Sequence, residues 1–517
     1  MSDTAQPLET AVVGGGVAGL YCAWRLSQQA DPSPGAIAVF EHTNRSGGRL
    51  WSEALDQEQA IPAELGGMFF SDAQDLVYRL CDQVLGLNHQ AVTPANDFAW
   101  VRGKRFMIQD FDQPGVLPYR LREDEQGLAE HELSMLCIRR IVPDIDQYWP
   151  LNPNATMSDT VRFLRSSSFD GRPLHDWGFW NLMARVISNE ARICLEDLEG
   201  TYAMYSNWNG LEAVFSLLCD LTGRWFRLPE GYQQLPDQLR EQARAAGVRI
   251  HLQSELLAVS APDHDGYRTL TFGGDRPSIK ARRVVLALPT GALQMLDIDA
   301  SDAFLSAIDA CTRVPACKLF MVFDQAWWEQ LPDGPGSIEV GHFAASHTDL
   351  PMRQCYYLGT DPGTGRALLL GAFGDGRSVS FWPALLDHKQ KRAVGVRPIP
   401  AVMRDELIRQ LSEIHDYPVP APTDAVFVDW TQPPFWAGWH SWKPGIKSWQ
   451  AAACLRGSEQ DPGLHVCGEA YSAWQGWVEG ALTSAEMLLT DQLGLAQPDW
   501  LADSECLAPY QPSHVAN

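Results

Sequence analysis

The sequence predicts an α/β protein whose nucleotide-binding domain is assembled from separated segments and is accompanied by a helical domain and an α+β substrate domain. Three observations lead to this fold class. A strand, a glycine turn, a helix and a second strand occupy the first 41 residues. Helix and strand alternate again over residues 231–288 and 464–489, far along the chain. Between these parts, residues 76–230 carry apolar positions at helical spacing, and residues 316–455 are rich in strand-like runs.

The first motif is the glycine turn Gly14-x-Gly16-x-x-Gly19. Glycines at these spacings allow a tight turn, a close approach of the backbone to a pyrophosphate, and packing of the helix against the strand. The helix that follows would direct its N-terminal amides at the phosphates. Glu41 follows about 20 residues later, where an acid can accept hydrogen bonds from a ribose. Because the strand, the helix and the acid accompany the glycines, we expect a dinucleotide cofactor.

The same pattern divides the chain into three pieces of the cofactor domain, two inserts on the substrate side and a tail. These are residues 9–75, 231–315 and 456–495; residues 76–230 (mainly helical) and 316–455 (substrate-binding); and residues 496–517. The tail contains prolines and is expected to be poorly ordered after Gln497.

Composition excludes several classes of function. The formal net charge of −24 argues against nucleic acid and anionic membranes as partners. The sequence contains no run of about 18 apolar residues, so we expect no transmembrane helix. The first residues resemble no signal peptide, which predicts a cytoplasmic protein. The 11 cysteines lack metal-ligand spacing, so we expect reduced thiols and no metal site.

Five short blocks carry a more specific resemblance. They are Arg45-x-Gly47-Gly48-Arg49; Glu64-Leu65-Gly66-Gly67-Met68; Gly231-x-x-x-Leu235-Pro236 with Ala287-Leu288-Pro289; Lys318 ten residues before Trp328; and Gly468-Glu469 with Gly476-Trp477-Val478-Glu479-Gly480-Ala481. In this order they resemble the FAD-dependent amine oxidase family, which includes monoamine, polyamine and L-amino acid oxidases. The resemblance extends from residue 11 to about residue 490 and implies a Rossmann-like FAD-binding domain.

The resemblance implies a set of FAD contacts. Arg45 and Arg49 suit a diphosphate because guanidinium groups pair with phosphate oxygens. The covalently flavinylated relatives carry a cysteine where this chain has Trp439, so noncovalent FAD is expected. The remaining expected contacts lie on the glycine turns, the strand ends and the start of the last helix: Gly14, Gly16, Gly19, Glu41, Gly48, Gly66, Gly67, Met68, Val259, Gly468, Glu469 and Val478.

Three residues are expected to be catalytic. Lys318 lies in a strand-like apolar run, where a charge is costly without a polar partner. In the resembling oxidases this lysine holds a water beside flavin N5, and a buried lysine readily lowers its pKa. Trp477 and His440 match the two aromatic walls of the family, with His440 replacing the usual tyrosine.

Phe69 leaves open whether the substrate carries an α-carboxylate. In L-amino acid oxidases this position usually holds an arginine that pairs with the substrate carboxylate, and a tyrosine that assists it is replaced here by Phe435. The candidate replacements are Arg353, Tyr356, Tyr357, His440 and Lys443, and the sequence does not choose among them. Trp436 and Trp439 are expected to line the pocket as well.

The expected reaction is FAD-dependent oxidative deamination of an L-amino acid with an aromatic or large apolar side chain. Its products would be an imino or keto acid, ammonia and hydrogen peroxide, formed at the expense of O2. Oxidation of primary amines or polyamines remains the alternative, followed by a flavin desaturase or isomerase and by a non-enzymatic flavin-binding regulator. The sequence does not reveal which enantiomer is oxidised or whether residues 385–400 form an access gate. It also leaves the oligomeric state open, and a homodimer is one possibility.

Overall fold

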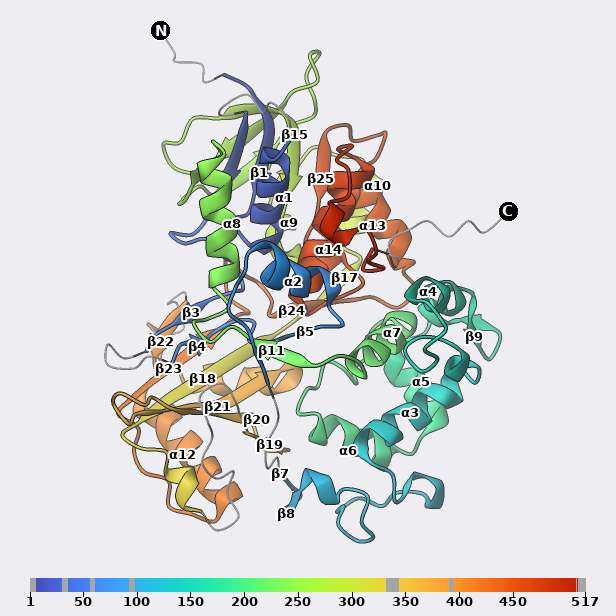
Figure 1. Cartoon of the computed structure of the whole chain (residues 1–517), viewed down its shortest axis with the longest axis vertical. Helices are drawn as coiled ribbons and strands as arrows, with labels where there is room; N and C mark the ends of the chain where they lie inside the picture. The colour runs from blue at the N-terminus through green and yellow to red at the C-terminus, as the bar shows by residue number, and fades with distance from the viewer. Residues whose placement is uncertain are drawn as a thin grey trace.

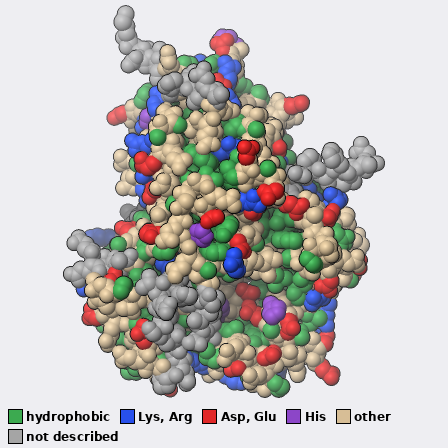
Figure 2. All heavy atoms as spheres, in the orientation of Figure 1, with side chains coloured by type: hydrophobic (Ala, Val, Ile, Leu, Met, Phe, Trp, Pro, Cys, Tyr) green, Lys and Arg blue, Asp and Glu red, His purple; other side chains and the backbone are tan. Residues whose placement is uncertain are grey.

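The computed structural model describes residues 6–29, 36–55, 61–92, 98–331, 344–389, 395–507 and 509. In Figure 1 a parallel-sheet lobe lies at the top, a helical lobe at the lower right and an antiparallel-sheet lobe at the lower left. Acidic side chains are scattered over the face shown in Figure 2, in keeping with the negative net charge. None of the described helices combines the length and the apolarity needed to cross a membrane.

The parallel-sheet lobe is built on an eight-stranded sheet with the order β12-β2-β1-β15-β14-β13-β16, to which β25 is added by pairing with β15. Its strands are β1 (Leu8–Val13), β2 (Ile37–Phe40), β12 (Arg249–His251), β13 (Leu256–Val259), β14 (Arg268–Phe272), β15 (Ile279–Leu286), β16 (Asp297–Ile298) and β25 (Leu464–Val466). β1 pairs in parallel with β2 and β15, and β15 pairs in parallel with β25. One sheet thus joins the beginning, the middle and the end of the chain, which confirms the predicted assembly from separated segments.

Three helices cover one face of this sheet: α1 (Val17–Ser27), α8 (Gln234–Ala245) and α14 (Val478–Asp491). All residues of α1 are buried. On one side, the indole of Trp24 donates a hydrogen bond to Gln242 of α8 (2.8 Å). On the other side, Arg25 donates to Glu486 of α14 (3.0 Å). The helix that starts at the glycine turn is therefore fixed between the two helices of the distant segments.

The antiparallel-sheet lobe contains a second eight-stranded sheet, with the order β22-β23-β18-β21-β20-β19-β7-β8. Its strands are β7 (Phe98–Val101), β8 (Lys104–Met107), β18 (Ala316–Phe323), β19 (Ala344–Thr348), β20 (Gln354–Thr360), β21 (Ala367–Asp375), β22 (Val396–Pro398) and β23 (Asp424–Asp429). All residues of β18 are buried because α12 (Ala401–His415) packs on one face of the sheet and residues 61–69 pack on the other. The sheet also recruits β7 and β8 from the segment expected to be mainly helical.

The helical lobe comprises α3 (Glu130–Ile141), α4 (Met157–Ser166), α5 (Phe179–Val186), α6 (Asn189–Leu198) and α7 (Gly210–Asp220). Polar side chains begin three of these helices. Thr156 accepts from the Asp159 amide, Ser188 from the Ala191 amide and Asn209 from the Leu211 amide. Such N-caps satisfy amides that have no partner inside the helix.

Shorter elements connect the lobes. They are β3 (Ser52–Glu53), β4 (Ala63–Glu64), β5 (Phe70–Ser71), α2 (Asp75–Arg79), β6 (Gln90–Ala91), β9 (Ser168–Phe169), β10 (Arg172–Pro173), β11 (Trp225–Arg227), α9 (Thr290–Leu293), α10 (Asp302–Ile308), β17 (Cys311–Val314), α11 (Phe381–Ala384), β24 (Trp439–Trp442) and α13 (Ser448–Arg456). Among them, β5, β11 and β6 form a three-stranded sheet between the parallel-sheet and antiparallel-sheet lobes. Residues 390–394, within the segment considered as a gate, lie outside the described residues.

The expectation of a poorly ordered tail is wrong for residues 498–507. Leu501, Cys506 and Leu507 are buried in the core of the parallel-sheet lobe. The Glu505 carboxylate accepts a hydrogen bond from the Met157 amide at the start of α4 (2.8 Å). Buried apolar side chains outweigh the local effect of the prolines, and the segment ties the helical lobe to the parallel-sheet lobe.

Candidate active site

The glycine turn lies where the first parallel strand meets its helix. Gly14 has a φ of +105°, and a Cβ atom there would approach the Ala287 carbonyl oxygen to 2.3 Å. A Cβ atom on Gly19 would approach the Gly14 carbonyl oxygen to 2.0 Å. Glycine is therefore required for α1 to pack this closely. No side chain caps the start of α1, so its first amides remain available to a ligand.

Glu41 is fixed beside this turn. It follows β2, and its carboxylate accepts hydrogen bonds from the Gly15 amide (2.7 Å) and the Thr43 amide (2.8 Å). Ligands of open α/β sheets bind at this carboxyl edge of the strands. The acid and the turn predicted from the sequence are therefore neighbours in the structure.

A second glycine loop lies against the first. The Gly47 amide donates to the Gly15 carbonyl (2.8 Å), and a Cβ atom on Gly48 would approach the Gly16 Cα to 3.1 Å. Arg45 folds back on this loop: it donates to the Leu50 carbonyl (3.0 Å), and its guanidinium lies 4.1 Å from the centre of the Trp51 ring. Burial lowers the pKa of Arg45 to about 10.

Arg49, which is partly exposed, meets the buried side chains of Glu469 and His440. The Glu469 carboxylate accepts hydrogen bonds from Arg49 (2.7 Å), from His440 Nδ1 (2.8 Å) and from the Gly476 amide (2.7 Å). Burial alone would raise the pKa of Glu469, but Arg49 and His440 outweigh it and lower the pKa to about 2. Glu469 thereby joins the second glycine loop, β24 and the loop that leads to Trp477.

The structure corrects the expected role of His440. Its side chain is 1% exposed and bound to Glu469, so it does not form an open wall opposite Trp477. Burial lowers its pKa. Its Nε2 atom is buried and meets no hydrogen-bond partner in the part of the chain that the structure describes. The ring is therefore enclosed by protein and serves to hold Glu469.

Val259 is expected to contact the cofactor, but the structure places it elsewhere. It lies between Leu270 of β14 and Ile298 of β16, and its carbonyl accepts from the Asp299 amide (2.9 Å). Its backbone is therefore committed to the sheet, at the end of β13 distant from Glu41. The opposite end of this segment reaches the acid, because the Ser254 amide donates to the Glu41 carbonyl (2.8 Å).

Taken together, these residues fit a flavin dinucleotide. The glycine turn and the start of α1 would hold the pyrophosphate, Glu41 the ribose, and the Arg49–Glu469 group the segment beyond it. α14 also begins without a side-chain cap at Trp477, so its first amides can face electronegative atoms of a ligand. Met68 and Gly66–Gly67 lie in the loop that packs between the two sheets.

Glu479, the next residue of the last block, has a structural role. It is fully buried, and its carboxylate accepts from the Leu76 amide (3.0 Å) and the Val77 amide (2.8 Å) at the start of α2. Burial raises its pKa to about 8. The residue therefore connects α14 to α2.

Lys318 lies at the centre of the antiparallel sheet and is 3% exposed. Its Nζ donates to the carbonyls of Glu64 (2.9 Å) and Gly66, and it lies 5.0 Å from the centre of the Phe373 ring. Burial lowers the pKa of Lys318 to about 7, against the attraction of Glu64. Burial raises the pKa of Glu64 to about 7 as well. Both groups can therefore exchange protons near neutral pH.

Aromatic side chains cluster beside the loop that holds this lysine and form the candidate walls of a substrate pocket, the aromatic pocket. Phe69 lies 6.3 Å from Tyr356, Phe435 4.6 Å from Trp430, and Trp439 6.5 Å from Phe373, all between ring centres. Trp477 lies 5.1 Å from Trp225 of β11. Neither Trp225 nor Phe373 is predicted from the sequence. No local signal marks either residue, because only the strand pairing shows which way they face.

Three predicted substrate contacts point away from this pocket. Tyr357 is fully buried on the α12 side of β20, where its hydroxyl meets His415 (2.6 Å). Arg353 is also fully buried and donates to Asp197 (3.2 Å). Trp436 has a φ of +63° and packs against Gly291 of α9. Each side chain is already engaged elsewhere, so none is positioned to bind a substrate.

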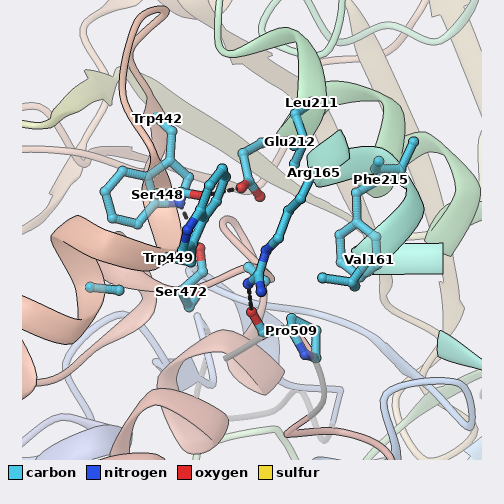
Figure 3. A pocket seen from close by; sticks show the side chains of 13 residues that line it. Val161, Arg165, Leu211, Glu212, Phe215, Trp442, Ser448, Trp449, Ser472 and Pro509 are labelled. Atoms are coloured by element: carbon cyan, nitrogen blue, oxygen red, sulfur yellow. Dashed lines mark hydrogen bonds between the residues drawn. The ribbon is translucent and has the colours of Figure 1, made fainter. Parts of the chain in front are cut away.

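A small cavity lies behind this region, between the helical lobe and α13 (Figure 3). Its volume is about 30 Å³, too small for an amino acid. Glu212 accepts a hydrogen bond from Ser448, and burial raises its pKa to about 7. Arg165 reaches across to the Pro509 carbonyl (Figure 3). The cavity is part of the lobe interface and is distinct from the aromatic pocket.

Known proteins share this architecture. Aplysianin-A of Aplysia kurodai is 25% identical over 546 residues, which cover 99% of this chain and 93% of that protein. An L-amino-acid oxidase of Mus musculus is 24% identical over 72% of this chain and 54% of its own. Among solved structures, a putrescine oxidase has a TM-score of 0.67 at 17% identity and covers 94% of this chain and 99% of its own. The cyclohexylamine oxidase of Brevibacterium oxydans IH-35A has a TM-score of 0.65 at 19% identity, over 94% and 99%. These structures show the same fold.

The family assignment rests on a match that spans most of the chain. The description of the matching family is flavin containing amine oxidoreductase, and the match covers residues 17–487. It includes Gly19, the last glycine of the turn, together with Lys318 and Trp477. The chain belongs to the flavin-containing amine oxidoreductases and is an FAD-dependent enzyme of that family.

Proposed function

We propose that the protein is an oxidase that deaminates L-amino acids with aromatic or large apolar side chains. The amino acid, O2 and water would be converted into the keto acid, ammonia and hydrogen peroxide. FAD, when bound, supplies the acceptor for a hydride from the substrate α-carbon and the route of the electrons to O2. Position 439 holds a tryptophan and not a cysteine that could bond to the flavin. This supports noncovalent binding of FAD.

The observation that carries this proposal is the environment of Lys318. Two carbonyls hold its Nζ at the bottom of an aromatic pocket, and its pKa of about 7 leaves a neutral amine available at neutral pH. A neutral lysine can position a water molecule and accept a proton from it. The substrate amine must also be neutral to lose a hydride, and apolar side chains around it would favour that form.

The aromatic side chains would orient the substrate. Trp477 with Trp225, and Phe69 with Tyr356, give a pocket that suits an apolar side chain and the face of an amine. Positioning of the α-carbon hydrogen relative to the cofactor is the main service that such a pocket provides. The name of the mouse relative, an L-amino-acid oxidase, supports this choice of substrate.

Oxidation of an amine without a carboxylate is the second candidate. Phe69 and Phe435 favour it, because neither side chain can donate a hydrogen bond to a carboxylate. The similar solved structures support it too, because they are named as a putrescine oxidase and a cyclohexylamine oxidase.

A peroxide-coupled screen decides between the two. The purified holoenzyme is offered the L-amino acids and, for each apolar one, the amine with the same side chain and no carboxylate. We expect the highest kcat/KM with L-phenylalanine, L-tryptophan or L-leucine. Peroxide formation with amines alone would exclude deamination of amino acids, and an absence of peroxide with both classes would exclude the oxidase assignment.

A further inference from the structure

One buried cation in the described part of the chain is left without a partner. Arg227, the last residue of β11, is 8% exposed. Other buried arginines are engaged: Arg25 with Glu486, and Arg353 with Asp197. Within the described residues, the Arg227 guanidinium makes neither a hydrogen bond nor an ion pair. A buried charge without a partner is costly, so such a group calls for an anion.

The strand geometry sets the direction of Arg227. Neighbouring residues of a strand face opposite sides, and alternate residues share a side. Phe226 faces the core of the parallel-sheet lobe, where its ring stacks on Phe70 at 6.0 Å. Trp225 faces the other side and meets Trp477 at 5.1 Å. Arg227 therefore shares the face that carries Trp225 and looks toward the aromatic pocket.

The pairing of β11 with β5 places Arg227 next to Phe69. Trp225 is opposite Ser71 and Phe226 is opposite Phe70. Continuing this register one residue beyond the end of β5 would place Arg227 across from Phe69. Residues directly opposite in an antiparallel pair have Cβ atoms about 4.5–5.5 Å apart. Phe69 in turn meets Tyr356, so Arg227 belongs to the same wall of the pocket.

Two carboxylates, those of Glu64 and Glu230, attract Arg227, but neither forms an ion pair with it in the described part of the chain. Glu64 attracts Arg227, but its carboxylate accepts from the Ser52 hydroxyl (2.6 Å) and the Tyr232 amide (2.8 Å). Its raised pKa also makes it a weak counter-charge at neutral pH. The planar guanidinium has five donors in a geometry that matches a carboxylate.

We propose that Arg227 binds the α-carboxylate of the substrate and thereby selects amino acids over amines. This inference rests on the proposed oxidase function. The cation that anchors the carboxylate would then lie at position 227 of β11 instead of position 69. Phe69 would form an apolar surface beside it. Arg227 is a specificity-determining residue that leaves proton handling to Lys318.

The test compares two substrates that differ only in the carboxylate: L-phenylalanine and 2-phenylethylamine. We expect Arg227→Met to raise the KM of the holoenzyme for L-phenylalanine about tenfold to a hundredfold, as expected for loss of a charge-assisted contact. The KM for the amine should change less than about twofold, since the amine makes no such contact. The KM of Arg227→Lys for L-phenylalanine should lie between those of the wild type and Arg227→Met. Arg224→Met is the matched control, because Arg224 precedes the same strand, pairs with Asp72 and has a side chain that is 75% exposed.

A binding measurement separates this role from a structural one. Calorimetric titration of the holoenzyme with 3-phenylpropanoate, which has the carboxylate but no amine, should show at least tenfold weaker binding to Arg227→Met. An equal loss for both oxidised substrates, or unchanged binding of 3-phenylpropanoate, would overturn the proposal. A wild-type enzyme that oxidises 2-phenylethylamine but not L-phenylalanine would overturn it and leave the oxidase assignment intact. If neither substrate is oxidised, the proposed function fails, and the titration still decides the role of Arg227.

Discussion

The nucleotide side and the substrate side of this molecule are built in different ways. On the nucleotide side, backbone groups of two glycine loops meet directly, as the hydrogen bond from the Gly47 amide to the Gly15 carbonyl shows. On the substrate side, the candidate pocket consists of side chains from β11, β18, β20, β21 and the loop that precedes β5. A backbone cradle depends on the absence of side chains and tolerates little change. A pocket of side chains can move a function from one strand to its neighbour, as proposed for Arg227.

The largest effect is expected from filling the cradle. In Gly19→Val the new side chain would collide with the Gly14 carbonyl, since even a Cβ atom would lie 2.0 Å from it. We expect α1 to shift and the purified protein to lose most of its FAD, measured as the ratio of flavin to protein. Gly363→Ala, at an exposed loop position, should retain the cofactor. Retention of FAD by Gly19→Val would show that the cradle is less dependent on backbone approach than proposed.

The next effect concerns the charged group that joins the two sides. Glu469→Gln removes the buried anion that Arg49 and His440 contact, which should lower the free energy of unfolding by about 1.5–3 kcal/mol. Glu459→Gln, at an exposed position, serves as the control in the same denaturant titrations. A loss below about 1 kcal/mol would place this group with ordinary surface ion pairs.

The pH dependence of this difference has a definite sign. The pKa of Glu469 is lowered from 4.5 to about 2 in the folded protein. Its stabilisation is therefore fully present above pH 4.5 and is lost as the pH falls toward 2. We expect the stabilities of the wild type and of Glu469→Gln to converge over that range. A constant difference down to pH 2 would contradict the assignment.

A smaller effect is expected on the substrate side. Lys318→Met should retain FAD but slow flavin reduction or reoxidation on the order of tenfold or more, because a positioned proton-handling group is lost. Stopped-flow measurements of the two half-reactions check this, with Lys443→Met, at an exposed position, as the control. In the wild type, the rates of these half-reactions should change with pH near 7, where the Lys318–Glu64 pair titrates. This pH dependence should be absent from Lys318→Met. Unchanged rates in both half-reactions would exclude the role of Lys318.

The smallest effect concerns the C-terminal segment that links the lobes. Glu505→Ala removes the acceptor of the Met157 amide at the start of α4, and we expect a loss of about 0.5–2 kcal/mol in the free energy of unfolding. Flavin content and KM should stay as in the wild type, because neither side of the site contacts Glu505. A changed KM would show that this segment also shapes the pocket.

The same contrast explains what the sequence could predict. The glycine turn, Glu41, Arg49, Lys318 and Trp477 belong to short contiguous motifs whose spacing carries their geometry. The choice between Tyr356 and Tyr357 depends instead on the face of β20, whose register with β21 shifts between Gln354 and Tyr356. No periodicity reveals such a bulge.

Other errors have similar physical causes. β13 contains a register shift between Leu256 and Ala258, so Val259 lies deeper in the sheet than its position in the sequence indicated. A positive φ turns Trp436 away from the pocket. Arg227 carries no motif at all, and it becomes significant only when the pairing of β11 with β5 is known.

The central claim is that this pocket removes a hydride from an amino acid that is held by its carboxylate. Anaerobic mixing of the holoenzyme with L-phenylalanine tests it most directly. We predict that the visible flavin absorbance is bleached, and that admission of O2 restores it with one hydrogen peroxide and one ammonia formed for each phenylpyruvate. Persistence of the oxidised flavin spectrum with L-phenylalanine and the other apolar L-amino acids, while 2-phenylethylamine bleaches it, would contradict the account.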